Sequence, residues 1–191
     1  MRMFDFTLPF TIDFDMMSGL SNTAISTKRY LSQMKNMFFD DKAYESMLKK
    51  EDVLVYEFYE LDAPTQDSDL AFGTSITYPG MVGNEYFMTK GHFHSILDTA
   101  EVYYCLSGEG CVLMENMEGV ACCMELKKGR AVYVPPGFAH RSINTGNIPL
   151  VTFFVFRADA GHDYKTIESK GFRKLLICDD GKPVLIDNPG F

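Results

Sequence analysis

The chain has 191 residues and a formal net charge of −8 at pH 7, with 46% hydrophobic and 23% charged residues. This balance is typical of a soluble globular protein, and at this length we expect a single domain over residues 1–191. The acidic balance argues against nucleic acid or an anionic membrane as the main partner, because both require a basic surface. It leaves open a small anionic substrate, since one positively charged site can bind an anion even when the net charge of the protein is negative.

The N-terminal region is expected to carry an arm and the helices. Residues 1–20 are predicted to form an extended arm. In residues 26–38 apolar side chains recur every three or four positions, and in residues 40–53 acidic residues precede lysines, as the helix dipole prefers. We therefore predict two short helices within residues 26–50, so that residues 1–52 form an N-terminal arm and helices.

From residue 53 onward the pattern changes to short β-rich runs. Gly, Pro, Asn and Asp separate them at intervals of roughly ten residues, which favours an antiparallel sandwich or barrel. The last segment, residues 171–191, is predicted to be a hairpin with Asp180 and Gly181 at its turn. Residues 53–191 are thus expected to form an all-β barrel with a C-terminal extension. The runs are residues 53–61, 71–80, 85–94, 101–116, 119–129, 130–137, 140–144 and 150–158.

The targeting and redox signals are weak. Asp5, Asp13 and Asp15 interrupt the apolar N-terminus, so it lacks the core of a signal peptide, and we expect a cytoplasmic protein. The five cysteines are irregularly spaced, and Cys122 and Cys123 are adjacent. Neither a disulfide framework nor a CxxC zinc motif fits, so we interpret the cysteines as small apolar filler in a reducing compartment.

Three of the four histidines gather with one glutamate in a pattern that predicts a metal site. His92 and His94 are two positions apart and share one face of a strand. Glu101 opens the next strand, where alternation alone does not decide which face is buried, and His140 follows a Pro-Pro-Gly turn. Three imidazoles and a carboxylate suit Fe(II), Mn(II), Ni(II), Co(II) or Zn(II). An octahedral ion would keep two open positions for a substrate with two adjacent oxygens.

The spacing of these residues resembles the two motifs of the cupin superfamily. The first motif departs in the gap between His94 and Glu101, which has six residues here and usually three or four in cupins. The resemblance implies the all-β cupin jelly-roll barrel, with a short N-terminal helical segment, but no single function. The first motif is met by His92, His94, Glu101 and Gly108, and the second, G-x5-P-x-G-x2-H-x3-N, by Gly129, Pro135, Gly137, His140 and Asn144.

Two further strings narrow the resemblance. TKGHFH at residues 89–94, with its six-residue gap, and AGHDYKTI at residues 160–167 resemble the cupin-type, or archaeal-type, glucose-6-phosphate isomerases. The resemblance runs from about residue 53 to the C-terminus, and the helical segment before it is similar too. The chain departs at Gly137, where familiar members have an aromatic residue, and at Ser75, where they have Thr. We expect the first change to alter a turn and the second to retain the hydroxyl.

The resemblance implies an enzyme that interconverts glucose 6-phosphate and fructose 6-phosphate in glycolysis and gluconeogenesis, as a homodimer. It implies one divalent ion per subunit, with Fe2+ preferred over Mn2+, Ni2+, Zn2+ or Co2+. The implied metal ligands are His92, His94, Glu101 and His140. The implied phosphate and sugar contacts are Tyr56, Ser75, Thr89, Gly91, Tyr103, His162 and Tyr164.

The residue types suit that substrate, although each has a structural alternative. The chain has no Gly-rich phosphate loop, so hydroxyls and the Gly91 N–H would have to donate to phosphate. Lys90 is expected either to add charge or to face solvent, and the tyrosines either to bind ligand or to pack in the core. His162 either contacts the sugar or holds its own segment, and Asp159 and Asp163 are expected to bind backbone or water.

Moving a hydrogen between C1 and C2 admits two routes. In the enediol route a base removes the C2 proton and returns it to C1. We predict Glu101 as this base, assisted by Tyr103 or His162. Because a carboxylate that binds a cation loses basicity, Glu101 would act through its free oxygen or leave the ion. In the alternative route a hydride shifts directly and Glu101 serves as a ligand.

Two other classes of function share parts of this pattern. An Fe(II) dioxygenase would use the same four ligands with an apolar pocket and no phosphate donors. A non-enzymatic sugar-binding cupin would carry a DNA-binding helix-turn-helix or lack the metal ligands, and residues 26–50 are not basic enough on one face for that. The residues alone leave open the metal, the use of mannose 6-phosphate and the oligomeric state.

Overall fold

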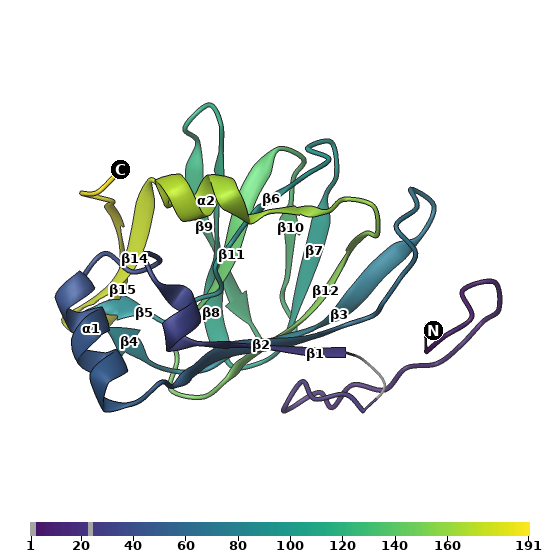
Figure 1. Ribbon diagram of the computed structural model, residues 1–191, viewed down its shortest axis with the longest axis horizontal. Helices are drawn as coiled ribbons and strands as arrows, with labels where there is room; N and C mark the ends of the chain where they lie inside the picture. Colours follow the sequence, from purple (N-terminus) through teal and green to yellow (C-terminus); the bar gives the residue numbers. More distant parts are fainter. Residues whose placement is uncertain (1–2, 23–24) are drawn as a thin grey trace.

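The computed structural model describes residues 3–22 and 25–191 and consists mainly of antiparallel β-sheet (Figure 1). A short helical segment and a C-terminal hairpin pack together at one end, and the N-terminal arm lies at the other. The elements in chain order are β1 (Ile25–Tyr30), the 3-10 helix η1 (Leu31–Met34), α1 (Asp41–Lys50), β2 (Leu54–Glu60), β3 (Leu70–Thr77), β4 (Met81–Val82), β5 (Glu85–Tyr86), β6 (Phe93–His94), β7 (Glu101–Ser107), β8 (Glu109–Asn116), β9 (Ala121–Lys127), β10 (Ala131–Val134), β11 (Phe138–Asn144), β12 (Leu150–Arg157), β13 (His162–Asp163), α2 (Tyr164–Lys170), β14 (Lys174–Asp179) and β15 (Lys182–Asp187).

The strand order of the two main sheets is that of a jelly roll. The larger sheet has the order β1-β2-β3-β12-β7-β10, and the smaller has β11-β8-β9. Bridges from Met88 to Ile143 and from His92 to His140 add residues 88–94 to the edge of the smaller sheet. Strands β3, β12, β7 and β10 then face a second set of four, as in an eight-stranded jelly roll. The predicted all-β jelly roll is confirmed, as two sheets without a closed ring of hydrogen bonds among the described strands.

The helical prediction is right for α1. Its N-cap residue Asp40 accepts a hydrogen bond from the Ala43 N–H at 2.9 Å, and Lys49 and Lys50 occupy the last turn. The cap satisfies an N–H that has no partner inside the helix, and the lysines complement the negative C-terminal end.

The prediction of a first helix from residue 26 is wrong over Ser26–Tyr30. These residues belong to strand β1, which pairs antiparallel with β2, and only Leu31–Met34 form a short 3-10 helix. The apolar spacing that favoured a helix spanned the junction between the strand and this 3-10 turn. Pairing with an existing sheet edge outweighs the weak local preference.

Strand β8 is buried on both faces. Cys111 and Leu113 belong to one core cluster, and Val112 and Met114 to the other. Such double burial accounts for the unbroken apolar run in this strand, in contrast to the alternation seen in β7. The smaller sheet therefore separates the interior of the jelly roll from a second core beneath the helical segment and the C-terminal hairpin.

The cysteine prediction is wrong for one pair. Cys111 and Cys123 form a disulfide between the neighbouring strands β8 and β9, with their Cα atoms 6.0 Å apart. Register places Cys123 opposite Leu113, diagonal to Cys111, so the pairing follows from sheet geometry that sequence spacing does not reveal. Cys105, Cys122 and Cys178 are free.

The predicted C-terminal hairpin is confirmed. Asp180 and Gly181 connect β14 to β15 with φ angles of 47° and 74°. Positive φ at both central residues is the requirement of the tight turn that matches the twist of a hairpin. None of the described helices has the length and apolar character that crossing a bilayer demands.

One buried carboxylate makes stability depend on pH. Glu85 in β5 is 4% exposed and accepts a hydrogen bond from the Phe39 N–H at 2.9 Å. Burial raises the pKa of Glu85 to about 7, partly opposed by the Phe39 N–H and by Arg141. The folded protein therefore keeps a proton on Glu85 that the unfolded chain releases near its ordinary pKa of 4.5.

We expect the free energy of unfolding to fall as pH rises from 5 to 8, by about 3 kcal/mol from this group. Glu85→Gln keeps an acceptor for the Phe39 N–H and should remove most of that dependence. Denaturant unfolding at several pH values measures it, with the exposed Glu118→Gln as the control. An unchanged slope in Glu85→Gln would show that another group carries the effect.

Candidate metal centre and substrate pocket

The four predicted metal ligands meet inside the jelly roll. His92, His94, Glu101 and His140 each present one ligand atom, and these atoms all lie within 4.8 Å of one another. Glu101 Oε2 is 3.1 Å from His94 Nε2 and 3.0 Å from His140 Nε2. The cluster draws on both sheets, because Glu101 lies on β7 of the larger and His140 on β11 of the smaller.

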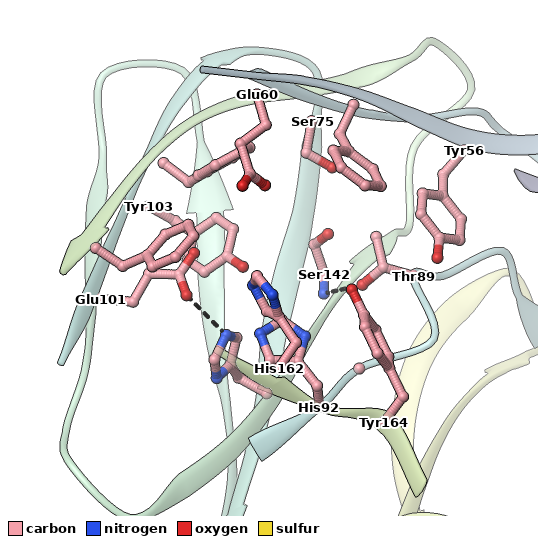
Figure 2. Close-up of a pocket in the computed structure, with 15 residues that line it drawn as sticks. Tyr56, Glu60, Ser75, Thr89, His92, Glu101, Tyr103, Ser142, His162 and Tyr164 are labelled. Atoms are coloured by element: carbon pink, nitrogen blue, oxygen red, sulfur yellow. Dashed lines mark hydrogen bonds and ion pairs between the residues drawn. The ribbon is translucent and has the colours of Figure 1, made fainter. Parts of the chain in front are cut away.

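The structure decides which face of β7 points inward. Glu101, Tyr103 and Cys105 are buried, whereas Val102 and Tyr104 are partly or fully exposed. The alternation places Glu101 and Tyr103 on the same inner face, two residues apart along the strand. Both predicted catalytic side chains of this strand therefore enter the pocket (Figure 2).

A threonine in the six-residue gap orients His94. The Thr99 hydroxyl donates to the Ile96 carbonyl at 2.6 Å, so it accepts from His94 Nδ1, 2.7 Å away. His94 Nδ1 then carries the ring hydrogen and leaves the lone pair of Nε2 facing Glu101. Partners of this kind fix the tautomer and orientation of metal-binding histidines. Thr99 was not among the predicted site residues, although it lies inside the departure from the cupin motif.

The residues fit a divalent cation. His92 Nε2 is buried and has no hydrogen-bond partner among the described residues. Burial, His140 and His162 lower the pKa of His92 well below its usual range, which keeps the ring neutral. Burial opposes ionisation of Glu101, but His140 and His94 hold its pKa below the usual range. Neutral imidazoles around an ionised carboxylate form a donor set that binds first-row divalent metals.

All seven predicted substrate contacts line one pocket beside this cluster (Figure 2). His94 alone of the predicted ligands lies behind the pocket wall, and the other three ligands line it. The pocket also contains side chains that the sequence analysis did not identify. The predicted contacts are Tyr56, Ser75, Thr89, Gly91, Tyr103, His162 and Tyr164, and the additional ones are Phe58, Glu60, Ser142, Phe154 and Phe156.

One end of the pocket is rich in neutral donors. Tyr56 is buried, and its hydroxyl bonds to the Arg29 side chain and the Lys90 N–H. Burial raises the pKa of Tyr56, although those two contacts act against it. Gly91 adopts a φ of +79°, and an added Cβ would lie 2.8 Å from Phe172, so the close backbone approach here requires glycine. Thr89 completes this end and accepts the Ser142 N–H at 3.1 Å.

The other end holds Tyr103 and His162. Burial raises the pKa of Tyr103 well above its usual range, and so does its hydrogen bond with Glu101. Burial lowers the pKa of His162 to about 4, against the pull of Glu101. Its ring lies 4.3 Å from that of His92, between centroids, and β13 pairs with β6 beside the cluster.

Of the two neighbouring aspartates, Asp163 binds backbone, as expected, whereas Asp159 pairs with a side chain instead. Asp163 caps α2 by accepting the Thr166 N–H at 3.3 Å. Asp159 binds Arg157 at 2.5 and 3.1 Å. Lys90 forms an ion pair with Glu168 at 2.7 Å. Neither alternative proposed for Lys90 describes it fully, because it is half-buried and already paired.

Comparison with known proteins identifies the family. Residues 28–188 match the family described as glucose-6-phosphate isomerase (GPI). A glucose-6-phosphate isomerase of Thermococcus litoralis is 46% identical over 181 residues, which cover 95% of each chain. The glucose-6-phosphate isomerase of Pyrococcus abyssi is 45% identical over 95% of this chain and 96% of its own length. That of Sinorhizobium medicae is 35% identical over 91% of this chain and 82% of its own length. The chain belongs to the glucose-6-phosphate isomerase family, and the resemblance is confirmed.

Thr99 offers a test of the metal centre that leaves every ligand in place. Thr99→Val removes the hydroxyl that holds the His94 tautomer and should weaken binding of Mn2+ or Zn2+ by about 10- to 100-fold. Thr99→Ser keeps the hydroxyl and should bind almost as tightly as the unchanged protein. Calorimetric titration of the metal-free protein measures both. Equal affinities for the two variants would exclude this role for Thr99.

Proposed function

We propose that the chain interconverts glucose 6-phosphate and fructose 6-phosphate with the help of a divalent metal ion. The observation that carries this proposal is the placement of the three-histidine, one-carboxylate cluster in the same pocket as the Tyr56, Thr89 and Gly91 donors. The end of the pocket with the cluster then suits two adjacent sugar oxygens, and the end with the Tyr56, Thr89 and Gly91 donors suits a phosphate. Membership in the isomerase family supports the same reaction.

The proposed ligands are His92, His94, Glu101 and His140, with one ion per subunit. Fe2+ is our first choice, and Mn2+, Ni2+, Zn2+ and Co2+ suit the same donors. The ion would supply positive charge beside the C1 and C2 oxygens, where negative charge develops during isomerisation.

We infer the direction in which the substrate binds from the position of the hydrogen-bond donors in the pocket. Tyr56, Ser75, Thr89, Gly91 and Tyr164 would bind the phosphate and the adjoining hydroxyls. Hydroxyl and backbone N–H groups donate hydrogen bonds to an anion without the desolvation cost of burying a cation. The phenyl rings of Phe154 and Phe156 suit the C–H face of the sugar chain. C1 and C2 would then lie next to Glu101, Tyr103 and His162.

We favour the enediol route, with Glu101 as the base. Its Oε2 faces His94 and His140, which leaves Oε1 as the oxygen that can accept the C2 proton. Tyr103, bonded to Glu101, would pass a proton between oxygens. His162 is neutral at physiological pH, because its pKa is lowered to about 4, so it can both donate and accept.

We further propose that the protein acts in the cytoplasm, in glycolysis and gluconeogenesis, as a homodimer. The reaction fits both pathways, because its two sugar phosphates differ little in free energy. The N-terminal arm lies against the larger sheet, where Thr74 Oγ1 donates to the Gly19 carbonyl at 2.5 Å. It remains our candidate for contact with a second copy.

A coupled assay tests the proposed reaction directly. Fructose 6-phosphate should be converted to glucose 6-phosphate, the activity should disappear with a chelator, and Fe2+ or another of the five ions should restore it. His140→Ala should lose metal affinity and at least a hundredfold in kcat/KM, whereas the exposed Glu118→Gln should keep both. Absence of turnover with every ion would overturn the proposed function, and full activity in His140→Ala would overturn the site.

Isotope exchange separates the two routes. In deuterated water the enediol route should place solvent deuterium on C1 or C2 of the product, because the base exchanges its proton with water. The direct hydride route leaves the product without deuterium. Mass spectrometry or proton NMR of the product at low conversion distinguishes them, and Glu101→Gln should abolish any incorporation that occurs.

A further inference from the structure

Two openings of opposite charge flank the segment that carries His162 and Tyr164. One is lined by Arg29, Lys90 and Lys165, together with the acidic Asp163 and Glu168. The other is lined by Glu60 and Asp62 and contains no basic side chain except His162. In the first opening Asp163 caps α2 and Glu168 pairs with Lys90, so its remaining charge is positive.

Arg29 is the cation of the first opening with a direct link to the pocket. It lies opposite Tyr56 in the pairing of β1 with β2, and its side chain bonds to the Tyr56 hydroxyl. Among the described residues no carboxylate forms an ion pair with Arg29. Its neighbour Lys28 points to the other face of β1, is half exposed and lies 3.9 Å from Glu57.

Glu60 is the carboxyl group of the second opening that also lines the pocket. It shares the inner face of β2 with Tyr56 and Phe58. In register, Glu60 pairs with Gly73, Gly73 with Phe154, and Phe154 with Tyr103. Glycine at position 73 lets β2 and β3 approach closely, because an added Cβ would lie 1.9 Å from the Tyr59 carbonyl oxygen. Figure 2 shows the Glu60 carboxylate directed into the pocket.

The Glu60 carboxylate lacks a partner in the described part of the chain. Neither a hydrogen bond nor an ion pair satisfies it there, although it is half-buried. Burial, together with the nearby Glu101 and Asp62, raises the pKa of Glu60 to about 7. A half-buried carboxylate that lines the pocket and has no protein donor can accept a hydrogen bond from a ligand.

We propose that Arg29 and Glu60 hold opposite ends of the substrate, Arg29 binding the phosphate and Glu60 accepting a hydrogen bond from a hydroxyl of the sugar chain beside the metal cluster. The inference rests on the proposed function and extends it. A phosphate at the Glu60 end would lie beside Glu60 and Asp62, whereas at the other end it would meet Arg29, so these side chains favour one direction of binding. That direction presents C1 and C2 to the reacting end.

Binding of inorganic phosphate separates the two ends, because phosphate occupies only one of them. The variants are Arg29→Gln and Glu60→Gln, with Lys28→Gln and Glu118→Gln as controls that change the same charge elsewhere. Calorimetry gives Kd for phosphate and for fructose 6-phosphate, and the coupled assay gives kcat and KM. Thermal unfolding checks that each variant is folded.

Arg29→Gln should weaken the binding of phosphate and of fructose 6-phosphate by a similar factor of at least ten. Its kcat should change less than threefold, because Arg29 would hold the phosphate equally in the bound substrate and in the transition state. Glu60→Gln should leave the phosphate Kd within twofold, or tighten it, while lowering kcat/KM about tenfold. Lys28→Gln and Glu118→Gln should stay within twofold in every measurement.

Three results would overturn the proposal. The first is equal affinity of Arg29→Gln and Lys28→Gln for phosphate. The second is a loss of phosphate affinity in Glu60→Gln as large as that in Arg29→Gln. The third is unchanged binding and turnover of fructose 6-phosphate in Glu60→Gln. If the unaltered protein binds phosphate but turns over no sugar phosphate with any metal, the proposed function fails. The two Kd values then still decide the roles of Arg29 and Glu60.

Discussion

The structure depends on one buried carboxylate held among imidazoles. Removing a carboxylate from water costs several kcal/mol unless nearby groups compensate, and Glu101 is 3% exposed. Glu101 lies on the larger sheet, whereas His94 and His140, whose Nε2 atoms are 3.1 and 3.0 Å from its Oε2, lie on the side of the smaller sheet. The two sheets therefore meet at this cluster, where the carboxylate and the Nε2 lone pairs of His92 and His94 form a set of acceptors that a cation would satisfy.

The departure from the general cupin motif has a physical purpose in this cluster. A longer gap between His94 and Glu101 gives the chain room to return with Thr99 against the ring of His94. The same turn brings Leu97 to Gly137, whose N–H donates to the Leu97 carbonyl at 2.7 Å. An added Cβ at Gly137 would meet nothing within 4 Å, but its φ of +79° favours glycine. The unusual spacing and the unusual glycine thus belong to one local structure.

Most of the fold and ligand set could be predicted, because period-two alternation and metal-ligand spacing are local signals. Arg29 and the disulfide could not be predicted in that way, whereas Glu60 was within reach of the same signal. Assigning residues 26–30 to a helix hid Arg29, since its approach to Tyr56 depends on β1 joining the sheet. Glu60 shares the face of Tyr56, so extending that alternation by four residues would have found it. The Cys111–Cys123 pair depends on strand register, which sequence spacing does not encode.

The overall charge of −8 and a dianionic substrate are compatible because charge acts locally. At physiological ionic strength, exposed charges are screened beyond about 8 Å, so distant acidic groups contribute little at the pocket. In the proposed binding, neutral hydroxyls and N–H groups inside the pocket would meet the phosphate, and Arg29 would meet it at the opening, where this side chain is only partly buried. The carboxyl group of Glu60 at the far end would then favour one direction of substrate binding. It would disfavour the reversed substrate, whose phosphate would lie beside it, more than it weakens the proposed binding. A pocket of this kind needs few cations, provided that its charges lie at opposite ends.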